Sequence, residues 1–155
     1  MEKYVEIMNG INNEINNFNS LLDSNYQFNT LPIDEIHNEK YFTDIINVPW
    51  KKQDWSIYAK SGVYFFFGYR KDNPEKLGVY IGKASFSDHI GNRLDNHFRY
   101  YDKEIGYKKT SYIIELFGHV SFNDEKIKCM TPALEEHLIT LLKYEYNLIN
   151  IIGNK

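Results

Sequence analysis

Apolar residues recur at steps of three and four positions from Glu2 to about Leu22, the spacing at which side chains share one helix face. Asparagine is frequent in this segment and is a poor helix former, so the predicted helix must depend on packing against the rest of the chain. The following stretch, to about Lys60, has no clear period and is expected to wrap around the core with short turns. The repeating apolar positions of the helix are Val5, Met8, Ile11, Ile15, Phe18 and Leu22.

Three later segments have the apolar, aromatic and β-branched composition of strands. The first covers residues 61–70, and the turn residues Asp72-Asn73-Pro74 separate it from a second at 77–83, which predicts a hairpin. A third strand is expected at 112–120. Side chains alternate between the two faces of a strand. One face of the first strand should therefore carry Val63, Phe65 and Phe67, and the other Tyr64 and Phe66.

Two further helices complete the expected fold. Ser85 or Ser87 is a candidate cap for a helix that runs to about Tyr101. Thr131-Pro132 supplies an N-cap and a first helical residue for a helix that runs to about residue 145.

Together these elements predict an α/β fold, with a small, mainly antiparallel sheet of about three strands flanked by helices. We expect residues 1–60 to form an N-terminal helical extension packed on the core, and residues 61–155 to form the main domain.

The net charge of −3 is unevenly distributed along the chain. Two lysines stand against eight acidic residues up to Val48, whereas sixteen basic and thirteen acidic residues follow from Pro49. A locally basic surface under an acidic extension suits a phosphate ligand, although an ordinary solvated surface has the same composition.

The remaining composition excludes several classes of protein. Cys129 stands alone, so neither an internal disulfide scaffold nor a cysteine-rich zinc site can form. No apolar run approaches the roughly 20 residues of a membrane span, and the first residues do not resemble a secretory signal. We therefore expect a cytoplasmic protein without a membrane partner.

Two short motifs lie on neighbouring predicted strands, namely Gly62-Val63-Tyr64 and Tyr80-Ile81-Gly82-Lys83-Ala84. Arg93 and His97 follow on one predicted helix, and Glu135 precedes a late asparagine. In this order and spacing, the set resembles the GIY-YIG nuclease family, with GVY in place of GIY.

The YIGKA form and the Arg-x-x-x-His pattern are most similar to the nuclease domain of the nucleotide-excision-repair incision subunit, where the last position is usually Tyr. The resemblance covers about residues 61–150. It implies a metal-dependent endonuclease that hydrolyses phosphodiester bonds in DNA and binds one Mg²⁺ or Mn²⁺ ion through a single carboxylate. A hard, oxygen-liganded ion that keeps most of its waters suits such a site.

Helical geometry distinguishes two adjacent carboxylates. Glu135 falls inside the apolar arc of its predicted helix, whereas Glu136 falls beside Lys143, on the side that faces water. An inward carboxylate needs a partner or a metal, so Glu135 is the predicted metal ligand. Both residues would also suit the first turn through the helix dipole alone. The apolar arc consists of Leu134, Leu138, Ile139 and Leu142.

Arg93 and His97 are four residues apart and project from one helix face. Arg93 offers a fork of donors that could hold the scissile phosphate, and the resemblance implies this role. For His97 it implies phosphate contact or proton transfer. A helix-edge arginine and a hydrogen-bonded core histidine are the plainer alternatives.

The resemblance directs the hydroxyls of Tyr64 and Tyr80 at the attacking water or the phosphate. We expect Tyr64 to orient or deprotonate the water and Tyr80 to act as a supporting donor, although both rings could also serve in sheet packing. Lys83 is expected to assist the site, and Gly82 to let the backbone pass close to a helix or a phosphate.

The late asparagine has two candidates. Asn147 follows Glu135 by twelve residues, a spacing similar to that of the repair-type domains, and Asn150 is the second choice. The expected role is structural, namely to pin the loop beside the site, and either residue could instead be an ordinary turn residue.

Three alternatives stay open. A domain on the same scaffold could bind nucleic acid or protein without cutting. The same chemistry could cut RNA, because no residue shows whether a 2′-hydroxyl is recognised. A metal site around His119 is disfavoured, since no histidine or cysteine ligands stand near it at metal-binding spacing. The oligomeric state, including a dimer, is left open.

Overall fold

The computed structural model describes residues 1–45, 60–85, 88–99, 101–102, 104, 106–107, 111–122 and 128–150. The predicted wrapping of residues 46–59 and the candidate helix cap Ser87 lie outside this set. So do five of the lysines of the predicted basic surface, Lys51, Lys52, Lys103, Lys108 and Lys109.

The described chain contains helices and strands in a mixed order. In order, they are η1 (Glu2–Tyr4), α1 (Val5–Asn19), η2 (Ile33–Glu35), β1 (Phe42–Asp44), β2 (Ser61–Arg70), β3 (Asn73–Ala84), α2 (Ile90–Phe98), β4 (Tyr101–Asp102), β5 (Gly106–Tyr107), β6 (Tyr112–Phe122), α4 (Thr131–Leu142) and β7 (Asn147–Leu148). None of the described helices has the length and apolar character needed to cross a membrane.

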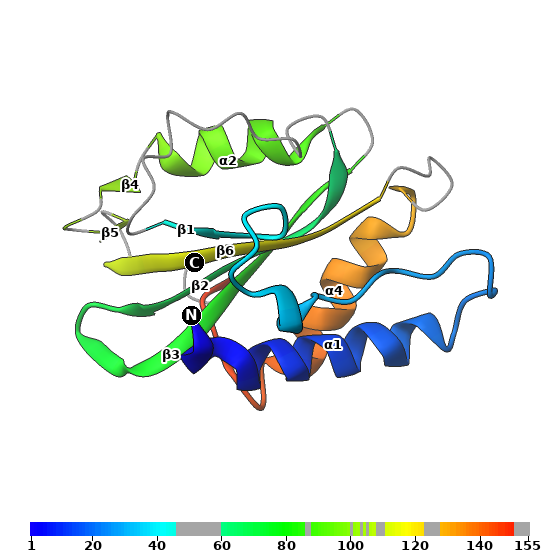
Figure 1. Cartoon of the computed structure of the whole chain (residues 1–155), viewed down its shortest axis with the longest axis horizontal. Helices are drawn as coiled ribbons and strands as arrows, with labels where there is room; N and C mark the ends of the chain where they lie inside the picture. Colours follow the sequence, from blue (N-terminus) through cyan, green and yellow to red (C-terminus); the bar gives the residue numbers. More distant parts are fainter. Residues whose placement is uncertain are drawn as a thin grey trace.

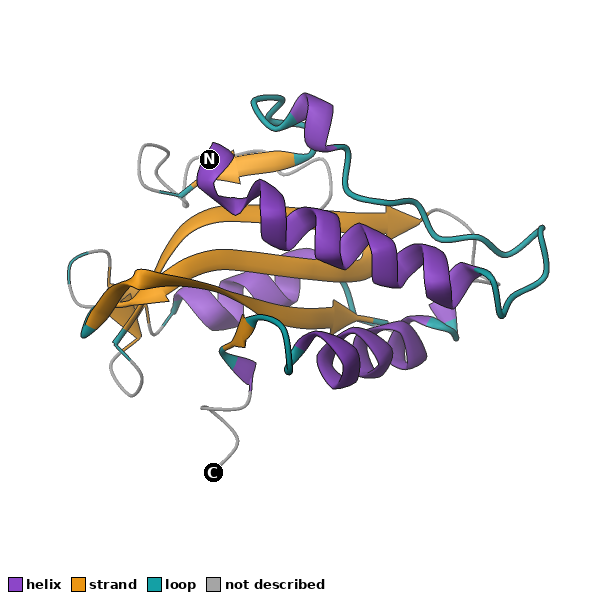
Figure 2. Cartoon of the chain, turned by 90° about the horizontal axis from the view of Figure 1, so that it is seen from below, coloured by secondary structure: helices purple, strands orange, loops and turns teal. Residues whose placement is uncertain are grey.

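A mixed sheet of five strands, in the order β1-β6-β2-β3-β7, forms the centre of the fold. The three long strands β6, β2 and β3 are antiparallel, while β7 runs parallel to β3. Helix α2 lies over one face, and α1 and α4 cover the other (Figures 1 and 2). The predicted α/β class is confirmed, but the expectation of about three strands omitted β1 and β7. These edge strands have three and two residues, too few for a pattern of alternation.

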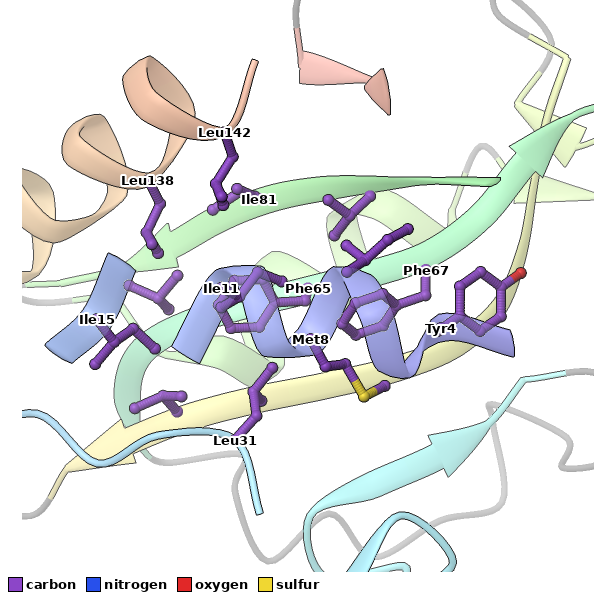
Figure 3. Packing of buried hydrophobic residues seen from close by; sticks show 14 of the residues in the cluster. Tyr4, Met8, Ile11, Ile15, Leu31, Phe65, Phe67, Ile81, Leu138 and Leu142 are labelled. Atoms are coloured by element: carbon purple, nitrogen blue, oxygen red, sulfur yellow. The ribbon is translucent and has the colours of Figure 1, made fainter. Parts of the chain in front are cut away.

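The alternation predicted for β2 is confirmed. Val63, Phe65 and Phe67 belong to the core beneath α1 and α4, whereas Tyr64 and Phe66 belong to the cluster beneath α2. Figure 3 shows the first of these faces, where Phe65 and Phe67 lie against the apolar side of α1. That side of α1 is formed by the fully buried residues Met8, Ile11 and Ile15, with Tyr4 just before the helix.

Asparagine side chains explain how α1 is held despite its weak helix propensity. Asn12 donates to the carbonyl of Leu31 and accepts from its N–H, both at 2.8 Å. Asn19, two turns later, makes the same pair of bonds with Phe28, also at 2.8 Å. The two amides thus hold the segment that follows α1 against the helix, through paired bonds to its backbone N–H and carbonyl groups. This helix depends on tertiary contacts, as predicted, and it is shorter than the predicted segment to Leu22.

The hairpin turn lies earlier than predicted. Lys71 and Asp72 form it, and Arg70 pairs with Asn73, so Asn73 and Pro74 already belong to β3. The register shifts between Tyr69 and Arg70, which leaves Pro74 in an irregular stretch that has no paired partner. A proline has no N–H to donate, so it is tolerated at such a bulge.

The helix boundaries also differ from the prediction. Helix α2 starts at Ile90 rather than near Ser85, because the backbone of His89 is extended, and the Ile90 N–H donates to the carbonyl of Lys60 at 2.9 Å. It ends at Phe98, and Tyr101 already belongs to β4. Helix α4 ends at Leu142 rather than near residue 145. Its N-cap is Met130, and Thr131 lies inside the first turn with its side chain fully buried, so its hydroxyl does not cap the helix.

Candidate active site

A cavity of about 410 Å³ opens between α2, α4 and the edge of β3. It gathers six of the seven side chains expected from the motifs, and Asn147 is the one that does not reach it. The consecutive elements β2, β3 and α2 contribute together with α4, which lies more than thirty residues further along the chain, so the convergence depends on the tertiary fold. The lining residues are Tyr64, Tyr80, Gly82, Lys83, Arg93, Asn96, His97 and Glu135.

The sheet register explains how one strand supplies residues to the site from both of its faces. Gly82 lies opposite Tyr64, so both belong to the face under α2. Lys83 lies opposite Val63 and so belongs to the face under α4. The site therefore extends around the edge of β3, where the α2 residues meet Glu135 of α4.

Gly82 makes room for the ring of Tyr64. A Cβ atom at position 82 would collide with that ring and would lie only 2.5 Å from its hydroxyl oxygen. This glycine is expected from the sequence to bring the backbone close to a helix or a phosphate, and the contact that the structure shows is with the Tyr64 ring. The close approach is made by the side chain of the first motif to the backbone of the second.

Tyr64 is buried and its hydroxyl lies 2.9 Å from Nε2 of His97. Burial, with a smaller effect of the Arg93 charge, lowers the pKa of His97 to about 4. The imidazole is therefore neutral at pH 7, and in the tautomer protonated at Nδ1 its Nε2 accepts a hydrogen bond from Tyr64. A neutral histidine in this position can also take up the phenolic proton.

Tyr80 lies beside this pair, with its ring centre 5.1 Å from that of His97. Burial raises the pKa of Tyr80, and the negative charge of Glu135 raises it further. The Arg93 charge and a hydrogen bond with Tyr64 act in the opposite direction. The net upward direction keeps the Tyr80 hydroxyl protonated at neutral pH, where it can donate a hydrogen bond.

Glu135 forms an ion pair with Lys83, with 2.5 Å between Oε2 and Nζ. Its side chain is 16 % exposed, whereas Glu136 is exposed on the outer side of α4. The helix geometry predicted from the sequence is thus confirmed for both residues.

The donor set at Glu135 limits which metal it could hold. Within the described part of the chain, no group of three or more His, Cys, Asp or Glu side chains comes together. One carboxylate facing a polar cavity suits a hydrated Mg²⁺ or Mn²⁺ ion that keeps most of its waters and shares the site with a phosphate. It does not suit zinc, which needs several protein ligands.

Arg93 is half-exposed at the mouth of the cavity and is also ion-paired. Its Nε lies 2.5 Å from Oδ2 of Asp88, which immediately precedes the residue that caps α2. Both cationic side chains that line the cavity thus have a carboxylate partner.

Asn150, rather than Asn147, holds the chain beside the site. Its side-chain oxygen accepts from the Ile81 N–H at 2.7 Å, and its amide donates to the Ile81 carbonyl. These bonds fix β3 between Tyr80 and Gly82. Asn147 lies in β7 and pairs with Gly78, away from the cavity lining. The first choice of the sequence analysis thus does not have the pinning role.

His119 is a core residue on β6. It is 7 % exposed and its Nε2 lies 3.3 Å from the carbonyl oxygen of Lys40. Burial lowers its pKa to about 4. These surroundings offer no support for the alternative of a histidine metal site.

Sequence reasoning missed two residues near the cavity, Asn96 and Asp88. Asn96 follows Arg93 by three positions, so helical spacing alone could have indicated it. Asp88 has no such signal, because it lies before the start of α2, where helical spacing does not apply.

No family model, curated protein or solved structure matches this chain. The function is therefore inferred from the geometry of its own residues.

Proposed function

We propose that this protein is a metal-dependent endonuclease that hydrolyses phosphodiester bonds in DNA, with an active site of the GIY-YIG type. The observation that carries the proposal is the single cavity that Tyr64, Tyr80, Lys83, Arg93, His97 and Glu135 line together. The antiparallel centre of the sheet, with its two motifs on the neighbouring strands β2 and β3, is compatible with this class.

A phosphodiester is cut by in-line attack of water, and negative charge grows on the phosphoryl and leaving oxygens. A Mg²⁺ or Mn²⁺ ion held by Glu135 would act as a Lewis acid toward these oxygens. Lys83 fixes the Glu135 carboxylate through their 2.5 Å contact and adds positive charge at the same end of the cavity.

Tyr64 and His97 form the proton acceptor in this proposal. The Tyr64 oxygen accepts a proton from the attacking water while its own proton passes to Nε2 of His97, 2.9 Å away. The lowered pKa keeps the imidazole neutral before the reaction, and it also makes the imidazolium a stronger acid than usual, which gives the proton up readily. The imidazolium then returns the proton to solvent, so the pair is restored after each turnover.

Arg93 and Tyr80 stabilise the phosphate as its charge grows. The guanidinium of Arg93 supplies several N–H donors, which match phosphate oxygens well. Tyr80 supplies a protonated hydroxyl, consistent with the upward direction of its pKa. Donors fixed in place before the reaction are worth most when charge develops in the transition state.

The direct test is incubation of the purified protein with plasmid DNA, single-stranded DNA and RNA, with and without Mg²⁺ or Mn²⁺. We expect nicking of the plasmid that requires the metal. Cleavage of RNA alone would favour a ribonuclease. Binding of DNA without cleavage under all conditions would favour the non-catalytic alternative and contradict the proposal.

A further inference from the structure

We propose that Asp88 is a positioning residue, which holds the guanidinium of Arg93 in the orientation needed for the phosphate. This inference rests on the proposed nuclease function and extends it to a residue outside the motif set. The observation that carries it is the 2.5 Å contact between Oδ2 of Asp88 and Nε of Arg93.

The atoms in this contact matter. An arginine has one N–H on Nε and its other donors on the two terminal nitrogens, all in one plane. Asp88 makes its closest contact with Nε, which carries only one of these N–H groups. Arg93 lines the cavity and Asp88 does not. The ion pair therefore anchors the base of the guanidinium of a side chain that borders the same space as Tyr64 and Glu135.

Asp88 can orient Arg93 only if it is itself fixed, and three hydrogen bonds provide this. Its Oδ1 accepts from the N–H of His89 at 3.0 Å, and its own N–H donates to the carbonyl of Ser85 at 3.1 Å. Two residues later, the Ile90 N–H donates to the carbonyl of Lys60 at 2.9 Å.

These bonds connect Asp88 to the sheet. Ser85 directly follows β3 and Lys60 directly precedes β2, so Asp88 and the start of α2 are tied to the ends of both motif strands. Arg93 is thereby held relative to Tyr64 and Lys83, and not only relative to its own helix.

The contact also has a cost for binding. A carboxylate 2.5 Å from Arg93 offsets much of its positive charge and therefore weakens its attraction for a phosphate in the ground state. Orientation, by contrast, accelerates the chemical step, since a misplacement of about 1 Å can lower a rate by about 10²-fold. Loss of Asp88 should thus affect binding and rate in opposite directions.

The test compares Asp88→Ala, Asp88→Asn, Arg93→Ala and the double variant Asp88→Ala/Arg93→Ala. Affinity for a duplex oligonucleotide is measured in EDTA, and the single-turnover cleavage rate is measured in Mn²⁺. Asp95→Asn is the matched control. It removes a negative charge from the same helix, at a position two residues from Arg93 that does not face it.

We expect Asp88→Ala to cleave about 10- to 100-fold more slowly and to bind the duplex as tightly as the wild type or more tightly. In the Arg93→Ala background, the additional loss of Asp88 should change the rate by less than about twofold, because a residue that acts through Arg93 has nothing left to position. Asp95→Asn should cleave like the wild type.

Asp88→Asn keeps the test valid if the alanine variant does not fold. Its side chain has the same size, but an NH₂ group replaces one of the two oxygens, and the contacts with His89 and Arg93 use different oxygens, so one of them is lost. We expect the same separation of rate from affinity, with a smaller loss of rate.

The inference is overturned if the wild type cleaves and Asp88→Asn and a folded Asp88→Ala keep its rate, or if the double variant shows the full product of the two single losses. A wild-type protein that cleaves nothing would instead reject the nuclease function itself, and the positioning role with it.

Discussion

The two faces of the central sheet are made by alternate residues of the same strands, yet they differ in chemistry. Phe65 and Tyr64 are neighbours on β2 and are 0 % and 2 % exposed, so burial does not distinguish them. Phe65 belongs to the apolar cluster beneath α1 and α4, whereas the Tyr64 hydroxyl lies 2.9 Å from Nε2 of His97. The comparison suggests that one face provides stability and the other provides a fixed polar site.

The largest expected effect concerns the apolar face. Phe65→Ala should lower the free energy of unfolding by about 3–5 kcal/mol, because it leaves a cavity in a fully packed core. Urea unfolding followed by circular dichroism measures this loss. A loss below about 1 kcal/mol would show that this face is not the main source of stability.

Arg93→Ala tests the polar site with little effect on the core, since Arg93 is half-exposed. The cleavage rate should fall by about 10²- to 10³-fold, as for other removed donors that stabilise a developing charge. Affinity for DNA should fall much less. Loss of affinity with an intact single-turnover rate would reduce Arg93 to an electrostatic anchor.

Tyr64→Phe separates packing from chemistry at one residue, because it removes a hydroxyl and keeps the ring. Cleavage should fall by about 10²-fold or more, the usual scale for a lost acid–base group, while thermal melting stays near that of the wild type. A fully active variant would limit the first motif to sheet packing.

A smaller effect should appear in the acid stability of the protein. Histidine has an unperturbed pKa of about 6.5, and His97 and His119 have pKa values of about 4 in the folded protein. Below pH ~6.5 the unfolded chain therefore takes up protons that the folded protein does not. Stability should be complete above this pH and fall as the pH approaches 4, by about 1–3 kcal/mol for each histidine.

Urea unfolding at several pH values tests this expectation. Between pH 7 and pH 4.5, the free energy of unfolding of His119→Asn should decrease less than that of the wild type. Carboxylates contribute equally to both proteins, so an unchanged slope would mean that burial of His119 does not govern its protonation.

The long elements could be predicted because periodicity extends over many residues. The ten residues of β2 and the apolar face of α1 match their patterns. The short strands β1 and β7 could not, since their pairing depends on β6 and β3, which lie far away in the sequence.

The same division applies to the site: local geometry allowed the roles of some residues to be predicted, whereas the roles of others depend on tertiary contacts. Helical spacing separated Glu135 from Glu136 correctly. Spacing from Glu135 favoured Asn147 over Asn150, but the pinning bonds depend on where the chain meets Ile81. In the same way, the role of Gly82 depends on the Tyr64 ring that crosses it.

The central claim is that the cavity is a metal-dependent nuclease site, and the adjacent pair Glu135 and Glu136 tests it most directly. The two residues share a helix turn and a charge, but only Glu135 lines the cavity. Metal-dependent nicking of plasmid DNA should disappear in Glu135→Ala and persist in Glu136→Ala, with both proteins folded. Nicking that survives in Glu135→Ala, or that is lost only in Glu136→Ala, would contradict the account.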